Sequence, residues 1–216
     1  MSKRNATATW SGFSHQGLIG LLVALRKIIE LDENDYDKYF LEYEIKEDAA
    51  IYKVDENGDR IYLSVHQVKA YYSDGHLLST YKDVLKGTEI IEKDIEGKKV
   101  KTGRFRNGDW CDKDNFLHTV MKITNWTDEN IKDIGNPNNV KRYEYVKDKF
   151  HCETTEISNM ILEELTKIPG VEKKKDRALK SLILMLDEKI RFEHKNKPSK
   201  ETYDICFSFE ALMNTV

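Results

Sequence analysis

Two polar side chains share one face of a predicted strand. Gln67 and Lys69 are two residues apart in an apolar run, and side chains two apart leave the same face of a strand. That face continues the apolar series Ile61, Leu63 and Val65. Lys69 therefore lies at the rim of a core-facing surface, where an ammonium group is costly to bury without a partner.

Acidic residues one strand earlier are the expected partners of this lysine. Glu44 and Asp48 precede the neighbouring strand, and Glu47 competes for either acidic position. Oxygen atoms of Glu44, Asp48 and Gln67 suit Mg²⁺ or Mn²⁺, which prefer oxygen ligands. A cation beside Lys69 would activate water and offset charge on a scissile phosphate, while the lysine orients the water or stabilises the transition state. A plain salt bridge between Lys69 and a glutamate is the alternative.

Hydrophobic periodicity predicts the elements that position these residues. An Asn-Gly pair at 57–58 is typical of a hairpin turn between two strands. The predicted elements, in order, are a helix over 16–31, strands over 39–45, 49–54 and 61–69, a helix over 77–87 and a strand over 116–124. The expected fold class is α/β: a helix, a three-stranded antiparallel meander, a helix and a strand.

The pattern changes near residue 150. Two stripes at helical spacing, over 157–168 and 179–190, are separated by Pro169-Gly170. Residues 205–209 then alternate before a short helical end. We therefore expect one domain over 1–149 and a helical C-terminal region over 150–216. The apolar end of the chain either docks on the domain or belongs to a longer protein.

The sequence contains an acidic turn followed, one strand later, by Val65-His66-Gln67-Val68-Lys69. An acid followed by a Gln-x-Lys segment resembles the signature of the restriction-endonuclease-like, or PD-(D/E)xK, superfamily. The opening segment Trp10–Gly17 and the pair Glu44 and Asp48 resemble the Cap4-type double-stranded DNA endonuclease domain, over residues 8–125. That domain occurs in the nuclease subunit of Lamassu and related ABC-three-component anti-phage systems. The stretch Leu179–Leu212 resembles the C-terminal interaction segment of such proteins.

The resemblance implies a role for each residue of the site. Asp48 takes the metal-binding acid position, Gln67 the second metal position and Lys69 the catalytic position. Glu44 matches the preceding acid, and Gln16 matches a polar residue of the first helix that supports the site. Because a neutral amide is a weaker ligand than a carboxylate, glutamine at position 67 implies a modest metal affinity. His66, one residue from Gln67, is expected to point away from the site.

The resemblance also implies an activity and partners. The expected protein is a Mg²⁺-dependent DNA endonuclease, an effector of a bacterial anti-phage or anti-plasmid defence complex that is activated by partner release or self-assembly. Its implied partners are DNA, an SMC-like ABC ATPase subunit, a small middle subunit and, in the active state, further copies of itself. The alternative is a catalytically silent assembly or sensor subunit with a nuclease-like fold.

A basic stretch could contribute to DNA contact. It contains Lys98, Lys99, Lys101, Arg104 and Arg106. These side chains would grip phosphates, or they belong to a solvated surface hairpin. The formal net charge of the chain is −3, which gives no support for a stand-alone nucleic-acid binder but fits a nuclease that partners bring to DNA.

Composition excludes other classes of protein. No run of about 18 apolar residues is present, so no membrane-spanning helix is expected. The three cysteines are widely spaced and form no CxxC pair, which argues against a structural zinc site and for a reducing cytoplasm.

Overall fold

The structure is a computed structural model. It describes residues 6–45, 47–70, 90–93, 99–103, 116–122, 141–150, 152–197 and 203–216, with the side chains of 14–45, 47–68, 143–150, 152–197 and 203–216. The helix predicted over 77–87 lies outside these residues.

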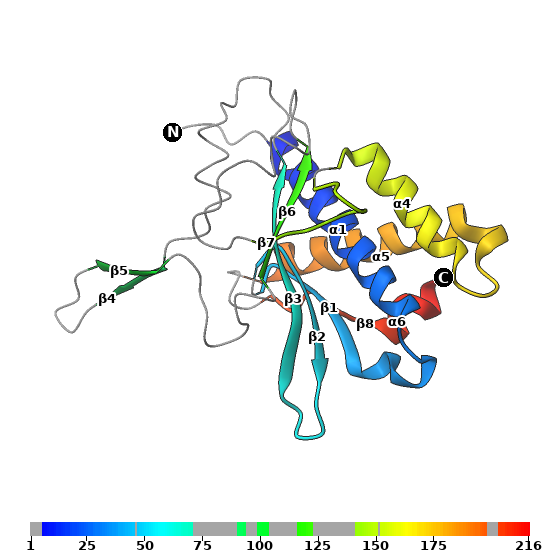
Figure 1. Cartoon of the computed structure of the whole chain (residues 1–216), viewed down its shortest axis with the longest axis horizontal. Coiled ribbons are helices and arrows are strands. Elements are labelled where there is room, and N and C mark those ends of the chain that lie inside the picture. The colour runs from blue at the N-terminus through cyan, green and yellow to red at the C-terminus, as the bar shows by residue number, and fades with distance from the viewer. Residues whose placement is uncertain are drawn as a thin grey trace.

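The first helix, α1 (Ala6–Ile29), is buried on almost every side over its second half. The sequence predicts one apolar stripe along this helix, formed by Leu18, Leu21, Leu22, Leu25, Ile28 and Ile29. Most of the stripe is confirmed, because Leu21, Leu22, Leu25 and Ile28 have no exposed surface, but Ile29 at its end is 36% exposed. Ile19, outside that stripe, also has no exposed surface. One face of α1 packs on the sheet, while α4 (Thr154–Thr166) and α5 (Lys175–Asn196) pack against it as well (Figure 1). The C-terminal helices therefore widen the buried surface of α1 beyond one stripe.

The main sheet is mixed and has six described strands in the order β7-β6-β3-β2-β1-β8. Its strands are β1 (Tyr39–Tyr43), β2 (Ala49–Val54), β3 (Arg60–Ala70), β6 (Phe116–Lys122), β7 (Lys141–Arg142) and β8 (Cys206–Ser208). The predicted antiparallel meander β1-β2-β3 is confirmed. The predicted strand near residue 116 is also present, and it pairs with β3 in parallel. The chain is thus a mixed α/β protein.

The remaining described elements are short. A 3₁₀ helix, η1 (Glu33–Lys38), leads from α1 into β1, and another, η2 (Glu172–Lys174), leads into α5. Strands β4 (Ile90–Lys93) and β5 (Lys99–Gly103) form a separate antiparallel pair. Helix α6 (Phe209–Thr215) closes the described chain. No described helix is long and apolar enough to cross a membrane.

One face expected from the sequence is interrupted. The series Ile61, Leu63 and Val65 was predicted to form a single core-facing row, but the β2–β3 register shifts between Ile51 and Tyr52. Beyond this bulge Ile61 is 41% exposed, whereas Val65 is fully buried. A β-bulge adds one residue to one strand, so the two sides of the bulge present opposite phases of the alternation. The prediction of a continuous face was therefore wrong.

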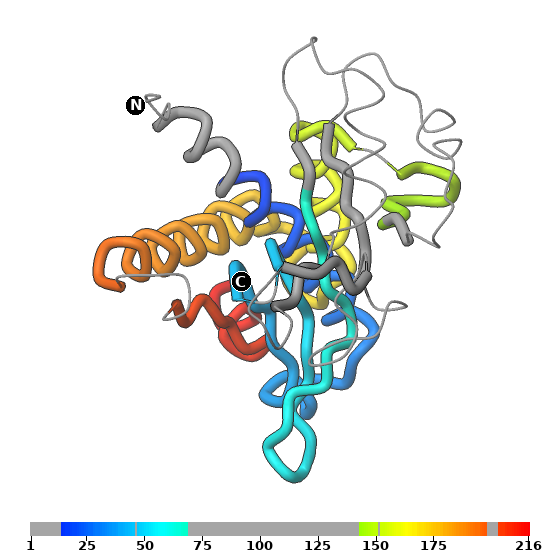
Figure 2. The backbone as a smooth tube through the Cα atoms, turned by 90° about the vertical axis from the view of Figure 1, so that its left-hand side faces the viewer, coloured from blue at the N-terminus to red at the C-terminus, as the bar shows by residue number. Residues whose placement is uncertain are grey.

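The C-terminal region shares the core of the rest of the chain. Strand β8 pairs with β1, and Ile205, Phe207, Phe209 and Leu212 belong to the same hydrophobic cluster as α1. Figure 2 shows this red segment beside the blue strand β1. Docking, one of the two alternatives for the apolar end, is therefore observed.

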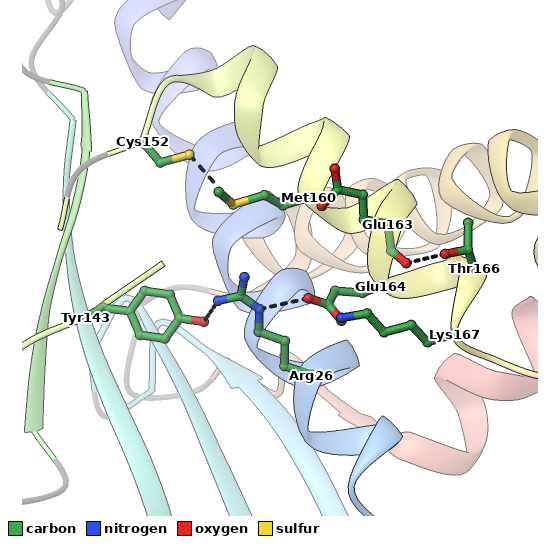
Figure 3. Close-up of polar contacts among 8 residues, drawn as sticks. All are labelled: Arg26, Tyr143, Cys152, Met160, Glu163, Glu164, Thr166 and Lys167. Carbon is green, nitrogen blue, oxygen red and sulfur yellow. Dashed lines mark hydrogen bonds and ion pairs between the residues drawn. The ribbon is translucent and has the colours of Figure 1, made fainter. Parts of the chain in front are cut away.

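A polar network joins α1 to α4 and to the segment after β7 (Figure 3). The Arg26 guanidinium donates to Tyr143 Oη at 2.8 Å and to Glu164 Oε1 at 3.1 Å. Lys167 is the second cationic partner of Glu164, which is only 7% exposed. Because a buried carboxylate needs cationic or hydrogen-bond partners, this network fixes α4 against α1.

We expect Gly20→Ala to destabilise the fold. A Cβ at this position would lie 2.5 Å from the ring of Tyr43, whose hydroxyl donates to the Gly17 carbonyl in the buried interior. Overpacking of this kind costs about 1–3 kcal/mol in the free energy of unfolding, which urea denaturation measures.

Gly17→Ala is the matched control on the same helix. Its Cβ would meet only Leu186 Cδ1 at 3.8 Å, an ordinary contact. Higher helix propensity should leave this variant equal to the wild type or more stable by up to about 1 kcal/mol. Equal stability of the two alanine variants would contradict the close contact between Gly20 and Tyr43.

Candidate active site between the first helix and the central strands

Asp48 is the best-defined residue of the candidate site. It lies directly before β2, where one carboxylate oxygen accepts from Gln16 Nε2 of α1 at 2.7 Å. The other oxygen accepts from the backbone N–H of Val68 in β3 at 2.6 Å. Two donors from different elements thus fix both the position and the plane of the carboxylate.

Gln67 and Lys69 flank the backbone group that binds Asp48. Ala49 pairs with His66, so Asp48 stands in register with Gln67 on the neighbouring strand. The Gln67 side chain is half-buried, and the Lys69 backbone pairs with Val120 of β6. The Lys69 side chain lies outside the described residues. Asp48, Gln16 and the strand that carries both Gln67 and Lys69 are therefore brought together.

Glu44 has a partner that the sequence did not indicate. The Oε2 atom of Glu44 lies 2.9 Å from Nε2 of His194, a residue in the last turn of α5. The Glu44 side chain is only 5% exposed. The Nδ1 atom of His194 is 3.4 Å from the hydroxyl of Tyr203. His194 follows Ile190 by four residues on a predicted helix, so the sequence indicates that both lie on the same helix face. Helical spacing alone does not show which strand that face contacts.

The oxygen donors at this site fit a hard divalent cation in kind. Asp48 offers carboxylate oxygens and Gln67 a side-chain carbonyl, and Mg²⁺ commonly uses one or two protein oxygens and keeps several waters. Among the residues with described side chains, no group of three histidine, cysteine or acidic residues could hold a metal ion. A cation bound here would therefore rely on few protein ligands.

The remaining predicted contacts fall mostly outside the described side chains. Lys99 and Lys101 lie on β5, which pairs with β4 in antiparallel fashion, and their side chains lie outside the described ones. Lys98, Arg104 and Arg106 lie outside the described residues, so phosphate contact by this stretch stays a prediction. Glu47, the competing acid, is half-buried.

His66 lies on the opposite face of β3 from Gln67, since neighbouring side chains of a strand alternate. It is 1% exposed, its Nε2 is 3.1 Å from Ser64 Oγ, and its ring meets that of Tyr143 edge to face. Burial lowers the pKa of His66 to about 3. His66 thus packs as a neutral core residue on the α1 side of β3, and the Gln67 side chain lies on the other face of the sheet.

We expect His66 to make the fold sensitive to acid. The unfolded chain takes up a proton at this residue near its ordinary pKa of 6.5, whereas the folded protein does so only near pH 3. Its contribution to stability is therefore complete above pH 6.5 and falls as the pH decreases toward 3. Between pH 6.5 and 5 this loss amounts to about 2 kcal/mol.

Urea denaturation at pH 7 and pH 5 measures this effect. His66→Phe should reduce the pH-dependent loss of stability by that amount, whatever its effect at pH 7. In the wild type, NMR should show the His66 ring neutral at pH 5. A ring that titrates near 6.5 in the folded protein would contradict its burial.

Residues 140–215 match the family model of C-terminal domain 1 of the ABC-three component (ABC-3C) systems. The match covers about a third of the chain and spans α4, α5, β8 and α6, the elements that pack against α1 and β1. No curated protein and no solved structure matches the chain. The C-terminal third is thus similar to a domain of a multi-subunit system, and the site described above lies outside the matched segment.

Proposed function

We propose that the chain is a metal-dependent DNA endonuclease that acts as an effector of a bacterial anti-phage or anti-plasmid defence complex. The observation that carries the proposal is the Asp48 carboxylate, held by Gln16 and by the Val68 N–H between Gln67 and Lys69. An acid fixed against a strand that carries an amide and a lysine two residues apart is the arrangement expected for metal-assisted phosphodiester hydrolysis.

Each residue then has a separable task. Asp48 and Gln67 would hold Mg²⁺ or Mn²⁺, with Glu44 as the further acid, and a bound cation would supply Lewis-acid stabilisation and a nucleophilic water. Lys69 orients the attacking water or stabilises charge on the phosphate. Gln16 touches no reacting group, and its task is to keep the Asp48 carboxylate in place.

The partners follow from the C-terminal match and from charge. Similarity of residues 140–215 to a domain of three-component systems supports an SMC-like ABC ATPase subunit and a small middle subunit as partners. A net charge of −3 favours weak binding to DNA by the isolated chain. DNA cleavage would then depend on delivery by these partners or on self-assembly.

A catalytically silent assembly or sensor subunit is the second candidate. Two observations favour it: position 67 is an amide, and the Glu44 carboxylate is engaged by His194. Cleavage assays with matched variants distinguish the two functions.

We expect Mg²⁺-dependent cleavage of plasmid or linear DNA that Lys69→Ala and Asp48→Asn each reduce at least about 100-fold. The assay covers a range of protein concentrations, with the chain alone and with the ATPase and middle subunits added. A steep rise with concentration would indicate activation by self-association, and a chelator should abolish cleavage in every case.

Lys180→Ala is the control, because this lysine lies on the exposed surface of α5. It should cleave as the wild type does, and circular dichroism should confirm that all variants are folded. Wild-type cleavage that survives Lys69→Ala would exclude the assigned site. No cleavage under any of these conditions, partners included, would favour the silent subunit.

A further inference from the structure

The turn that carries Asp48 is held at both of its ends. We call residues 44–48 the acidic turn, with Lys46 outside the described residues. Asp48, at its second end, is bound by Gln16 of α1 and by the Val68 N–H of β3. Glu44, at its first end, is bound by His194 of α5. The first of these contacts belongs to the predicted site, whereas the second comes from the segment that matches the C-terminal domain.

Glu44 adopts a conformation that needs external support. Its φ is +57°, in the left-handed region that disfavours residues with a side chain. Its carboxylate is almost fully buried, and a buried carboxylate requires a donor. His194 Nε2 supplies that donor at 2.9 Å. Loss of this contact would leave a buried carboxylate beside a strained backbone, and the turn would be expected to move.

His194 is itself held in place from two directions. Its ring packs against Tyr203, with 4.7 Å between the ring centroids, and its Nδ1 faces the Tyr203 hydroxyl. The preceding residue, Glu193, is 2% exposed and accepts from the backbone N–H of Asp204 at 2.8 Å. The last turn of α5 and the start of the 203–208 segment thus form one rigid support.

The same support is joined to the strand that precedes the acidic turn. The backbone N–H of Tyr43 donates to the Ile205 carbonyl at 2.9 Å, and β8 continues the pairing along β1. The end of β1 and the Glu44 side chain are therefore both attached to the C-terminal segment. A displacement of α5 relative to the sheet would act directly on the acidic turn.

We propose that His194 is a positioning residue through which α5 holds the acidic turn, and with it the Asp48 carboxylate, in the geometry of the site. One consequence of this inference rests on the proposed function: the C-terminal segment would then control metal binding and cleavage. A protein partner that moves the end of α5 would thereby switch the site. The structural link itself is testable without any catalytic activity.

The first measurement is amide hydrogen exchange by NMR. The N–H of Val68 donates to Asp48, so its exchange rate reports on the position of that carboxylate. His194→Phe keeps an aromatic ring against Tyr203 but removes the donor to Glu44. We expect at least about tenfold faster exchange at Val68 and within the acidic turn, with the buried amides of α4 unchanged, because local opening is independent of global unfolding.

Two further variants test whether the lost donor, rather than the substitution itself, causes the faster exchange. His194→Gln retains an N–H donor and should restore slow exchange at Val68 at least in part. His194→Leu, which also lacks a donor to Glu44, replaces the phenylalanine variant should that fail to fold. Lys195→Ala, at the adjacent exposed position, should behave as the wild type does. Unchanged exchange at Val68 in the His194 variant that lacks a donor to Glu44 would overturn the inference, and so would a uniform increase across the whole protein.

The second measurement is the Mg²⁺ concentration that gives half-maximal DNA cleavage. Loss of a residue that orients a ligand typically weakens metal binding 10- to 100-fold, so His194→Phe should raise this concentration about tenfold and His194→Gln less. An unchanged Mg²⁺ dependence would overturn the predicted control of the site. Faster exchange at Val68 in His194→Phe, combined with a wild type that never cleaves DNA, would uphold the structural link and refute the proposed nuclease.

Discussion

The Asp48 carboxylate is the contact on which the candidate site depends, because it joins three elements that are distant in sequence. It receives one donor from α1 and one from β3, and it lies at the start of β2. A carboxylate has no donor of its own when ionised, so it accepts from any element that presents an N–H. Here the donors are the side-chain amide of Gln16 and the backbone N–H of Val68. The carboxylate is fixed only when α1 and β3 bring both donors close to it. The acid therefore helps to set the distance between helix and sheet as well as to form the site.

The helix that supplies Gln16 is held by other helices as well as by the sheet. The Arg26, Glu164 and Tyr143 network fixes α4 on α1, and α5 closes a further face. The segment that is similar to a C-terminal domain of three-component systems is consequently part of the same hydrophobic core as the sheet. Under the proposed role of His194, a displacement of that segment would reach the site through the packed helices and through the contact between His194 and Glu44. This continuity gives a physical basis for coupling between partner subunits and the proposed chemistry.

One carboxylate is buried on the face of the sheet that α1 does not cover. On the face away from α1, the Glu42 carboxylate is 1% exposed and is satisfied by Arg60 and the Tyr62 hydroxyl. Because side chains alternate along a strand, Glu42 lies on the opposite face of β1 from Leu41 and Tyr43, but alternation does not show whether that face is buried. The reason is that burial depends on neighbours from β3, and the bulge between Ile51 and Tyr52 decides which of those residues share its face. The same bulge ended the predicted row from Ile61 to Val65.

The sequence by itself determined the local order of this protein. Periods of two and of about 3.6 residues are set by backbone geometry, so the α1 stripe, the β1-β2-β3 meander, β6 and the apolar end were predictable. Residue types and spacing also indicated Asp48, Gln67 and Lys69, because these are local properties, whereas Gln16 was indicated only by the resemblance to a nuclease family. Tertiary structure alone decided that β8 pairs with β1, that α5 brings His194 to Glu44 and that His66 is a buried neutral residue. Those outcomes depend on contacts between residues far apart in the sequence, such as Phe40 and Ser208 or Glu44 and His194, and no local pattern encodes which distant surface a given face will meet.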